Sequence, residues 1–131
     1  MEAASKHFRK RDAILDCIRT TKVHPSAEWV FSQLKPMIPD LSLGTVYRNL
    51  SLFRQQGKII SVGTVHGVER FDGNVNPHVH FICTGCGAVL DLEEMTVPDS
   101  LTVQAAGCTG GAVLECNLSF TGTCETCTHQ N

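Results

Sequence analysis

Four of the seven cysteines form two pairs whose spacing suits a metal ion. Two residues separate Cys83 from Cys86, and two separate Cys124 from Cys127. This spacing lets both thiolates of a pair reach one tetrahedral ion at about 2.3 Å, and a glycine within or just after the pair, such as Gly85 or Gly87, relieves the tight turn. Four sulfur ligands leave no open coordination position. The pattern therefore predicts a structural Zn²⁺ site and not a catalytic one.

Disulfide bonds and a dithiol redox site are the alternatives for these cysteines. Disulfides need an oxidising compartment, but the N-terminal residues lack the apolar stretch of a secretory signal. The sequence contains no run of about 18 apolar residues, so it predicts no membrane span. We therefore expect a cytoplasmic protein with no membrane segment, and a redox site would need only one pair. Cys17, Cys108 and Cys116 are expected to be small buried hydrophobic residues.

A set of histidines and aspartates could bind a second metal ion. His78 and His80 follow the period of a β-strand, which points both imidazoles to one face. His24, Asp72 and Asp91 could complete the set, and one ion bound by all five would join the two halves of the chain. Three nitrogens and two carboxylates suit Fe²⁺ or Mn²⁺ better than tetrahedral zinc. The alternative is that His78 and His80 are two ordinary surface histidines. We interpret His7, His66 and His129 as surface residues.

Charge divides the chain at about residue 60. The overall net charge is −2, but residues 1–60 hold ten of the eleven Lys and Arg residues and only five acids. Residues 61–131 hold one Arg and eight acids. A basic half joined to an acidic half indicates a module that binds a polyanion, followed by a module with another role. Ordinary scatter of surface charge is the alternative.

The basic half has the pattern of three helices and a hairpin. Apolar periodicity predicts a first helix over 6–20. Ser26 and Ser42 are candidate N-caps, and Gly57 is a candidate stop for the third helix. The remaining expected elements are helices over Ala27–Pro36 and Leu43–Gln56 and strands over Lys58–Val65 and Val68–Phe71 around His66-Gly67. This order is that of a winged helix-turn-helix.

The third helix is the candidate for reading the major groove of DNA. Val46, Leu50 and Phe53 form its apolar face, which leaves other side chains directed outward. A plain helical bundle with solvated arginines is the alternative. The candidate DNA contacts are Thr45, Tyr47, Arg48 and Asn49, together with Arg11 in the basic stretch of the first helix.

The acidic half is expected to be a small α/β unit, so the fold class is α+β. We expect a DNA-binding domain over 1–72, a hinge over 73–77 and a metal-binding dimerisation domain over 78–131. A unit of this size buries little apolar surface alone, so it should pack against a second copy. Its expected elements are strands over His78–Cys83, Ala88–Leu92 and Ala112–Phe120, with a helix over Asp99–Ala106 that ends at Gly107.

A series of motifs in fixed order covers nearly the whole chain. They are His24-Pro-Ser-Ala-Glu28, Ser42-Leu-Gly-Thr-Val-Tyr-Arg-Asn-Leu50, Arg70-Phe-Asp72, His78-Val-His80, Cys83-Thr-Gly-Cys-Gly87, Asp91 and Gly122-Thr-Cys-Glu-Thr-Cys127. In these motifs the chain resembles the ferric uptake regulator family, and within it the peroxide-stress (PerR-type) regulators. The resemblance implies a homodimeric repressor that binds double-stranded DNA at AT-rich palindromes. It implies zinc on Cys83, Cys86, Cys124 and Cys127, and a regulatory Fe²⁺ or Mn²⁺ on His24, Asp72, His78, His80 and Asp91.

The resemblance also implies a mode of sensing. In similar proteins, a short carboxylate at the position of Asp72 marks a peroxide sensor, in which iron chemistry oxidises the residues that match His24 and His78. We therefore expect a peroxide-responsive repressor that is not an enzyme. The alternatives are an iron- or manganese-responsive repressor without peroxide chemistry, a zinc-dependent thiol oxidoreductase and a zinc-ribbon adaptor.

Overall fold

The computed structural model describes residues 5–129, with side chains from residue 9 onward. His7, which the sequence analysis interpreted as a surface residue, lies outside the described side chains. The chain forms two compact units, one ending at Val75 and the other beginning at Asn76. Each unit is described separately below. Within residues 5–129, no helix is long and apolar enough to cross a membrane.

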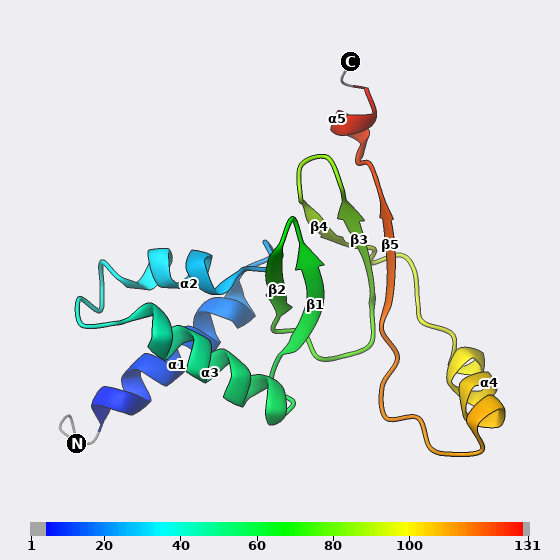
Figure 1. Ribbon diagram of the computed structural model, residues 1–131, viewed down its shortest axis with the longest axis horizontal. Helices are drawn as coiled ribbons and strands as arrows, with labels where there is room; N and C mark the ends of the chain where they lie inside the picture. Colours follow the sequence, from blue (N-terminus) through cyan, green and yellow to red (C-terminus); the bar gives the residue numbers. More distant parts are fainter. Residues whose placement is uncertain (1–4, 130–131) are drawn as a thin grey trace. The chain divides into compact units, whose positions relative to one another are not determined.

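The first unit contains three helices followed by a β-hairpin (Figure 1). Helix α2 ends two residues before the expected end because residues 35–38 form hydrogen-bonded turns, in which the amides of Met37 and Ile38 both donate to the carbonyl of Leu34. Helices and a sheet in this order confirm the predicted α+β winged-helix class. The elements are α1 (Ser5–Thr20), α2 (Ala27–Leu34), α3 (Leu43–Gln55), β1 (Ile60–Val65) and β2 (Val68–Asp72).

Serine side chains begin the second and third helices. Ser26 Oγ accepts a hydrogen bond from the amide of Trp29, and Ser42 Oγ accepts one from the amide of Thr45, both at 3.1 Å. Each bond satisfies a helix amide that has no carbonyl partner within the helix. After α3, Gly57 has a positive φ of 73°, as its expected role at the helix end requires.

The three helices bury one continuous apolar core. The predicted face of α3 is buried completely, because Val46, Leu50 and Phe53 are each at most 1% exposed. These side chains pack with residues of α1 and α2, with Ile59 just before β1 and with Phe71 of β2. This packing leaves the opposite face of α3 directed outward. The other buried members of this cluster are Ile14, Ile18, Ala27, Val30, Leu34, Leu41, Ile59 and Phe71.

The hairpin closes through the expected dipeptide. His66 and Gly67 have φ values of 51° and 78°, so both lie in the left-handed region that a tight two-residue turn requires. Val65 pairs with Val68 across this turn, and the register shifts between Ser61 and Gly63.

The second unit contains a three-stranded sheet of order β4-β3-β5. Strand β3 is antiparallel to β4 and parallel to β5. In Figure 1 the helix α4 lies in the long connection from β4 to β5, and α5 follows β5. The elements are β3 (Val79–Cys83), β4 (Val89–Asp91), α4 (Asp99–Thr109), β5 (Leu118–Gly122) and α5 (Glu125–Thr128).

Two expected boundaries in this unit were wrong. The helix continues through Gly107 and ends at Thr109, because Gly110 and not Gly107 takes the left-handed conformation that stops it. The strand expected over Ala112–Phe120 is confined to Leu118–Gly122, because only those residues lie opposite β3, which begins at Val79.

The second unit leaves much apolar surface uncovered. Helix α4 has no buried residue among its described positions. Val103 is 70% exposed and Leu114 is 96% exposed, and Leu90, Leu101 and Phe120 are also exposed. Cys108, expected to be buried, is exposed on this helix, where none of the described side chains is buried. Cys17 and Cys116 are half-buried.

Candidate metal centres and nucleic-acid interface

The four cysteines of the two CxxC pairs form one cluster in the second unit. Cys83 ends β3, and Cys86 follows in a turn held by hydrogen bonds between Cys83 and Ala88 and between Cys83 and Gly87. Cys124 is the N-cap residue of α5, and Cys127 lies within that helix. The parallel pairing of β3 with β5 places the two knuckles at the same end of the sheet.

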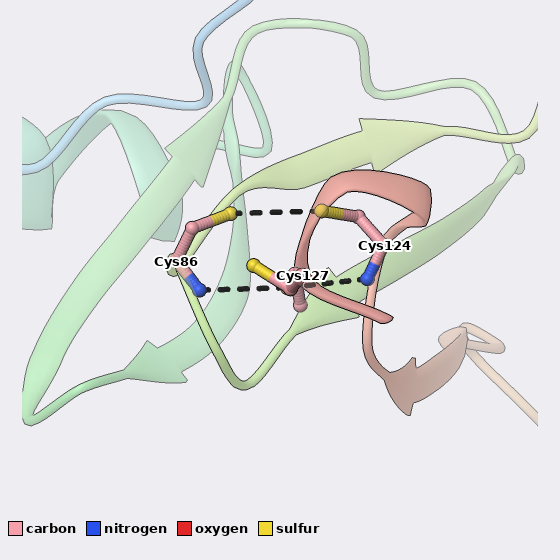
Figure 2. Close-up of side chains that lie close together, drawn as sticks. Cys86, Cys124 and Cys127 are labelled. Carbon is pink, nitrogen blue, oxygen red and sulfur yellow. Dashed lines mark hydrogen bonds between the residues drawn. The ribbon is translucent and has the colours of Figure 1, made fainter. Parts of the chain in front are cut away.

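The sulfur atoms are spaced as a tetrahedral ion requires. One Sγ atom from each cysteine lies within 4.8 Å of the others. The sulfurs of Cys86 and Cys124 are 3.9 Å apart. Figure 2 shows these two sulfurs facing each other, with the Cys127 sulfur directed into the same space. Four thiolates at about 2.3 Å from one Zn²⁺ would be about 3.8 Å apart. The donor set and its geometry therefore fit a closed zinc site.

Hydrogen bonds prepare one of these thiols as a thiolate. The backbone amides of Cys86 and Cys124 donate to Cys83 Sγ at 3.5 and 3.3 Å, and they lower the pKa of Cys83 to about 6. The neighbouring sulfurs, first Cys83 and then Cys124, raise the pKa of Cys127 to about 12. A bound cation would oppose this rise, because it favours the thiolate form of Cys127.

Gly85 permits the close approach of the second knuckle to the first. A Cβ atom at this position would lie 2.9 Å from Cys127 Sγ and 3.0 Å from Cys127 Cβ. These distances are shorter than real side chains tolerate, so any larger residue would displace Cys127. Position 85 therefore needs glycine for this close contact, whereas the left-handed residue of the turn is Gly87, with a φ of 77°.

The first unit contributes a buried histidine and aspartate pair. His24 Nε2 lies 3.3 Å from Asp72 Oδ2, and the two side chains are 3% and 11% exposed. The other carboxylate oxygen of Asp72 accepts a hydrogen bond from the amide of Asn74 at 2.8 Å, which fixes the orientation of the carboxylate. This unit thus presents one nitrogen and one oxygen donor side by side.

Arg70 holds the loop that carries His24. Its Nη2 donates to the carbonyl of Val23 at 2.7 Å, and its Nε donates to the carbonyl of His24. The amide of Phe71 also donates to the carbonyl of Pro25 at 2.9 Å. These bonds tie the loop to β2, which ends at Asp72, and they support a positive φ of 55° at His24.

The second unit brings together His78, His80 and Asp91. His80 is paired with Asp91 in the β3–β4 register, and Nε2 of each histidine lies 3.2–3.3 Å from the same oxygen, Asp91 Oδ1. His78 Nδ1 is 2.7 Å from the carbonyl of Asn76, which can only accept a hydrogen bond. Both nitrogens of His78 therefore face acceptors. Neutral imidazole has a single N–H, so this arrangement favours a cation, a proton or a metal ion, beside Asp91.

The candidate DNA contacts lie on and near the exposed face of α3. Tyr47 is 46% exposed and Arg48 is exposed, whereas Thr45 and Asn49 are half-buried. The side-chain amide of Asn49 donates to the carbonyl of Thr45 at 2.8 Å, so the Asn49 side chain is bound to its own helix. Arg11 is half-buried on α1. Tyr47 and Arg48 are thus the most accessible members of the predicted set.

Two cross-links fix α3 against its neighbours. Tyr47 Oη donates to Glu28 Oε2 on α2 at 2.6 Å, and this bond lowers the pKa of Glu28. Arg54 Nη1 lies 3.2 Å from Glu69 Oε2 on β2. The sequence analysis did not predict the bond of Glu28 to Tyr47, the bonds of Arg70 to the loop of His24 or the contact of Gly85 with Cys127. All three residues lie in motifs that it named, but their partners lie elsewhere in the sequence.

Comparison with known proteins identifies the family and agrees with the fold. The model of the ferric uptake regulator family matches residues 2–121. The peroxide operon regulator of Bacillus subtilis (strain 168) is 32% identical over 118 residues, which cover 90% of this chain and 81% of that protein.

Solved structures share the fold. The peroxide stress regulator of Campylobacter jejuni superposes with a TM-score of 0.79 at 22% identity, covering 96% of this chain and 94% of that one. The ferric uptake regulator of Francisella tularensis, determined with iron, gives a TM-score of 0.72 at 25% identity, with 91% of each chain covered. With its winged helix, its four-cysteine cluster and its two groups of histidine and aspartate donors, the chain belongs to the ferric uptake regulator family of metal-responsive repressors.

Proposed function

We propose that this protein is a peroxide-responsive transcriptional repressor whose affinity for DNA depends on a bound metal ion. The observation that carries the proposal is the placement of the donors. A winged-helix unit ends in the His24–Asp72 pair, and the next unit begins with His78, His80 and, on the adjoining strand, Asp91. One ion bound by all five would join the DNA-binding unit to the other unit, so binding of the ion would favour one arrangement of the two.

The DNA-binding step uses the exposed face of α3. Arg48 supplies charge and hydrogen bonds to phosphate or guanine, and Tyr47 supplies apolar contact to base edges in the major groove. Two such helices in a dimer would read a palindromic site, and we propose an AT-rich double-stranded operator. The uncovered apolar side chains of the second unit, including Val103 and Phe120, support its role as the dimer interface.

The two metal sites have different tasks. Zn²⁺ on Cys83, Cys86, Cys124 and Cys127 would link the end of β3 to α5 and stabilise the second unit. Fe²⁺ or Mn²⁺ would occupy the nitrogen and oxygen donors, because these ions accept higher coordination numbers and harder ligands than structural zinc. The carboxylates of Asp72 and Asp91 would supply the negative charge at that site.

Sensing requires a chemical change in the histidines. Fe²⁺ held by these residues would supply the reactivity toward hydrogen peroxide that Mn²⁺ would not. Overall, a ring C–H group of His24 or His78 would become C–OH, the ring would lose two electrons to the peroxide, and the other peroxide oxygen would leave as water, so one oxygen would be added for each peroxide consumed. The oxidised ring is a poorer metal ligand, and loss of the ion would release the DNA-binding unit from its fixed arrangement.

A peptide mass map tests the proposal directly. Zinc-containing protein loaded with Fe²⁺ under anaerobic conditions would receive a slight excess of peroxide, with a Mn²⁺-loaded sample as control. One added oxygen on the peptide of His24 or His78, with iron only, supports the proposal. If neither peptide changes while DNA binding stays metal-dependent, the protein is an iron- or manganese-responsive repressor without peroxide chemistry.

DNA binding is tested separately by fluorescence anisotropy. Protein loaded with Zn²⁺ and Mn²⁺ should bind a selected duplex with a steep decrease in affinity as salt rises, and a chelator should abolish this binding. If the protein does not bind duplex DNA under any of these conditions, the result would instead support the zinc-ribbon adaptor. Thiols that react freely with zinc in place would support a thiol oxidoreductase.

A further inference from the structure

The cross-link between the two helices of the helix-turn-helix carries a further inference. The Tyr47 hydroxyl, on α3, donates to the Glu28 carboxylate, on α2, at 2.6 Å. This length is typical of a hydrogen bond to an ionised acceptor, which is about twice as strong as a neutral bond. The tyrosine ring is 46% exposed, so a single distant side chain fixes the direction of an otherwise accessible group.

The carboxylate of Glu28 is out of place on a phosphate-binding surface. It is exposed, and it lies in the half of the chain that carries ten of the eleven basic residues. A negative charge beside the recognition helix weakens the attraction to every DNA duplex, whatever its sequence. The bond to Tyr47 stabilises the ionised form of Glu28, since it lowers the pKa of the carboxyl group. The feature that distinguishes this carboxylate is therefore its hydrogen bond to a side chain of the recognition helix.

The Tyr47 ring has open space beside it. A cavity of about 100 Å³ lies next to the pair and is lined by Glu28, Tyr47, Val68 and Glu69, among others. The Tyr47 ring could turn toward this cavity if its hydroxyl were released. Glu69, the other acid of the lining, is already paired with Arg54 at 3.2 Å. Glu28 is thus the group placed to hold the ring in its outward position.

We infer that Glu28 is a positioning residue that determines sequence specificity, because it holds Tyr47 in the conformation that contacts base edges. This inference rests on the proposed DNA-binding function of α3. The phenol ring offers an apolar face and edge that suit the methyl group of thymine. Ordering the ring in advance favours the correct sequence and so increases discrimination. The Glu28 charge weakens binding to all duplexes alike, so it leaves the ratio of affinities unchanged.

Four variants of the full-length protein, loaded with Zn²⁺ and Mn²⁺, test the inference. Two duplexes are used: an AT-rich palindrome selected in vitro with the wild-type protein, and a scrambled duplex of the same composition. The readout is the ratio of the two dissociation constants, measured by fluorescence anisotropy at fixed salt. The variants are Glu28→Ala, Glu28→Gln, Tyr47→Phe and the double substitution of Glu28→Ala with Tyr47→Phe.

Glu28→Ala and Tyr47→Phe should each reduce the ratio by about three- to tenfold, the cost of ordering one side chain at an interface. The double substitution should reduce it no further, because both single changes break the same bond. Glu28→Gln should retain the ratio, because its side-chain oxygen still accepts the hydrogen bond. With one negative charge less, it should bind both duplexes at least as tightly as the wild type does.

Other results would overturn the inference. If Glu28→Ala keeps the wild-type ratio, or if the two single effects multiply in the double variant, Glu28 does not act through Tyr47. If Glu28→Gln loses the ratio as Glu28→Ala does, the charge and not the hydrogen bond is responsible. Circular dichroism of each variant identifies any loss of folding. A wild-type protein without metal-dependent DNA binding would contradict the proposed function itself, which is a distinct outcome.

Discussion

Substitution of Gly85 by alanine should weaken zinc binding although it changes no ligand. The added methyl group would lie 2.9 Å from Cys127 Sγ, whereas ordinary contacts begin at 3.4 Å. Cys127 would have to retreat by about half an ångström, which exceeds the roughly 0.2 Å tolerance of a zinc–ligand distance. The first knuckle or helix α5 must therefore shift to restore four-sulfur ligation.

The size of the effect follows from the cost of overpacking. One methyl group forced into a filled site costs about 1–3 kcal/mol. All of this strain falls on the metal-bound state, in which Cys127 is held in place, so the zinc affinity of Gly85→Ala should fall by about 5- to 150-fold. The protein would still bind zinc, because a structural site contributes about 10–16 kcal/mol.

The assay is competition with a chromophoric zinc chelator under anaerobic, reducing conditions. Gly107→Ala is the matched control, because Gly107 lies in helix α4, where an added Cβ would meet no atom within 4 Å beyond its own helix backbone and chain neighbours. Its zinc affinity should equal that of the wild type, and helix α4 should gain stability. A Gly85→Ala protein whose affinity stays within twofold of wild type would refute the steric reasoning.

Three further predictions concern the first unit. Arg70→Ala should reduce Mn²⁺ affinity by about 10- to 100-fold, because the loop of His24 loses its two side-chain hydrogen bonds; calorimetry that finds unchanged affinity would exclude this role. Ser42→Ala removes the N-cap of α3 and should cost about 1 kcal/mol in the free energy of unfolding, measured by denaturant titration; an unchanged midpoint would contradict it. The pKa of Glu28 is lowered from 4.5 by its bond to Tyr47, so the stability this bond provides is complete above pH 4.5 and is lost as pH falls through the lowered value. Glu28→Gln should therefore show a smaller decrease in melting temperature between pH 6 and pH 3, and an identical decrease would count against it.

Local patterns in the sequence were sufficient for most elements of the first unit. Ser26 and Ser42 begin helices where the sequence placed them, because an N-cap bond spans only three residues. The turn at His66 and Gly67 is equally local. The CxxC spacing likewise predicted which cysteines would gather, since two intervening residues constrain a pair without help from the rest of the chain.

The ends of the strands and the helix in the second unit depend on tertiary contacts that the sequence pattern does not reveal. Strand β5 is as long as its pairing with β3 allows, and the apolar residues from Ala112 onward continue the pattern without continuing the strand. Gly107 resembles a helix stop in sequence, but Gly110 takes that role. Cys108 is exposed because the described part of α4 buries none of its residues, which composition alone cannot reveal.

The sequence by itself determined the kinds of donor that this protein has and the helix that faces outward, because spacing and periodicity are properties of neighbouring residues. Only the tertiary structure decided how those groups are held. The contact of Gly85 with Cys127, the bonds from Arg70 to the loop of His24 and the bond from Tyr47 to Glu28 join residues 19 to 47 positions apart. Such contacts depend on how whole elements pack, because no local rule relates the two ends of each one.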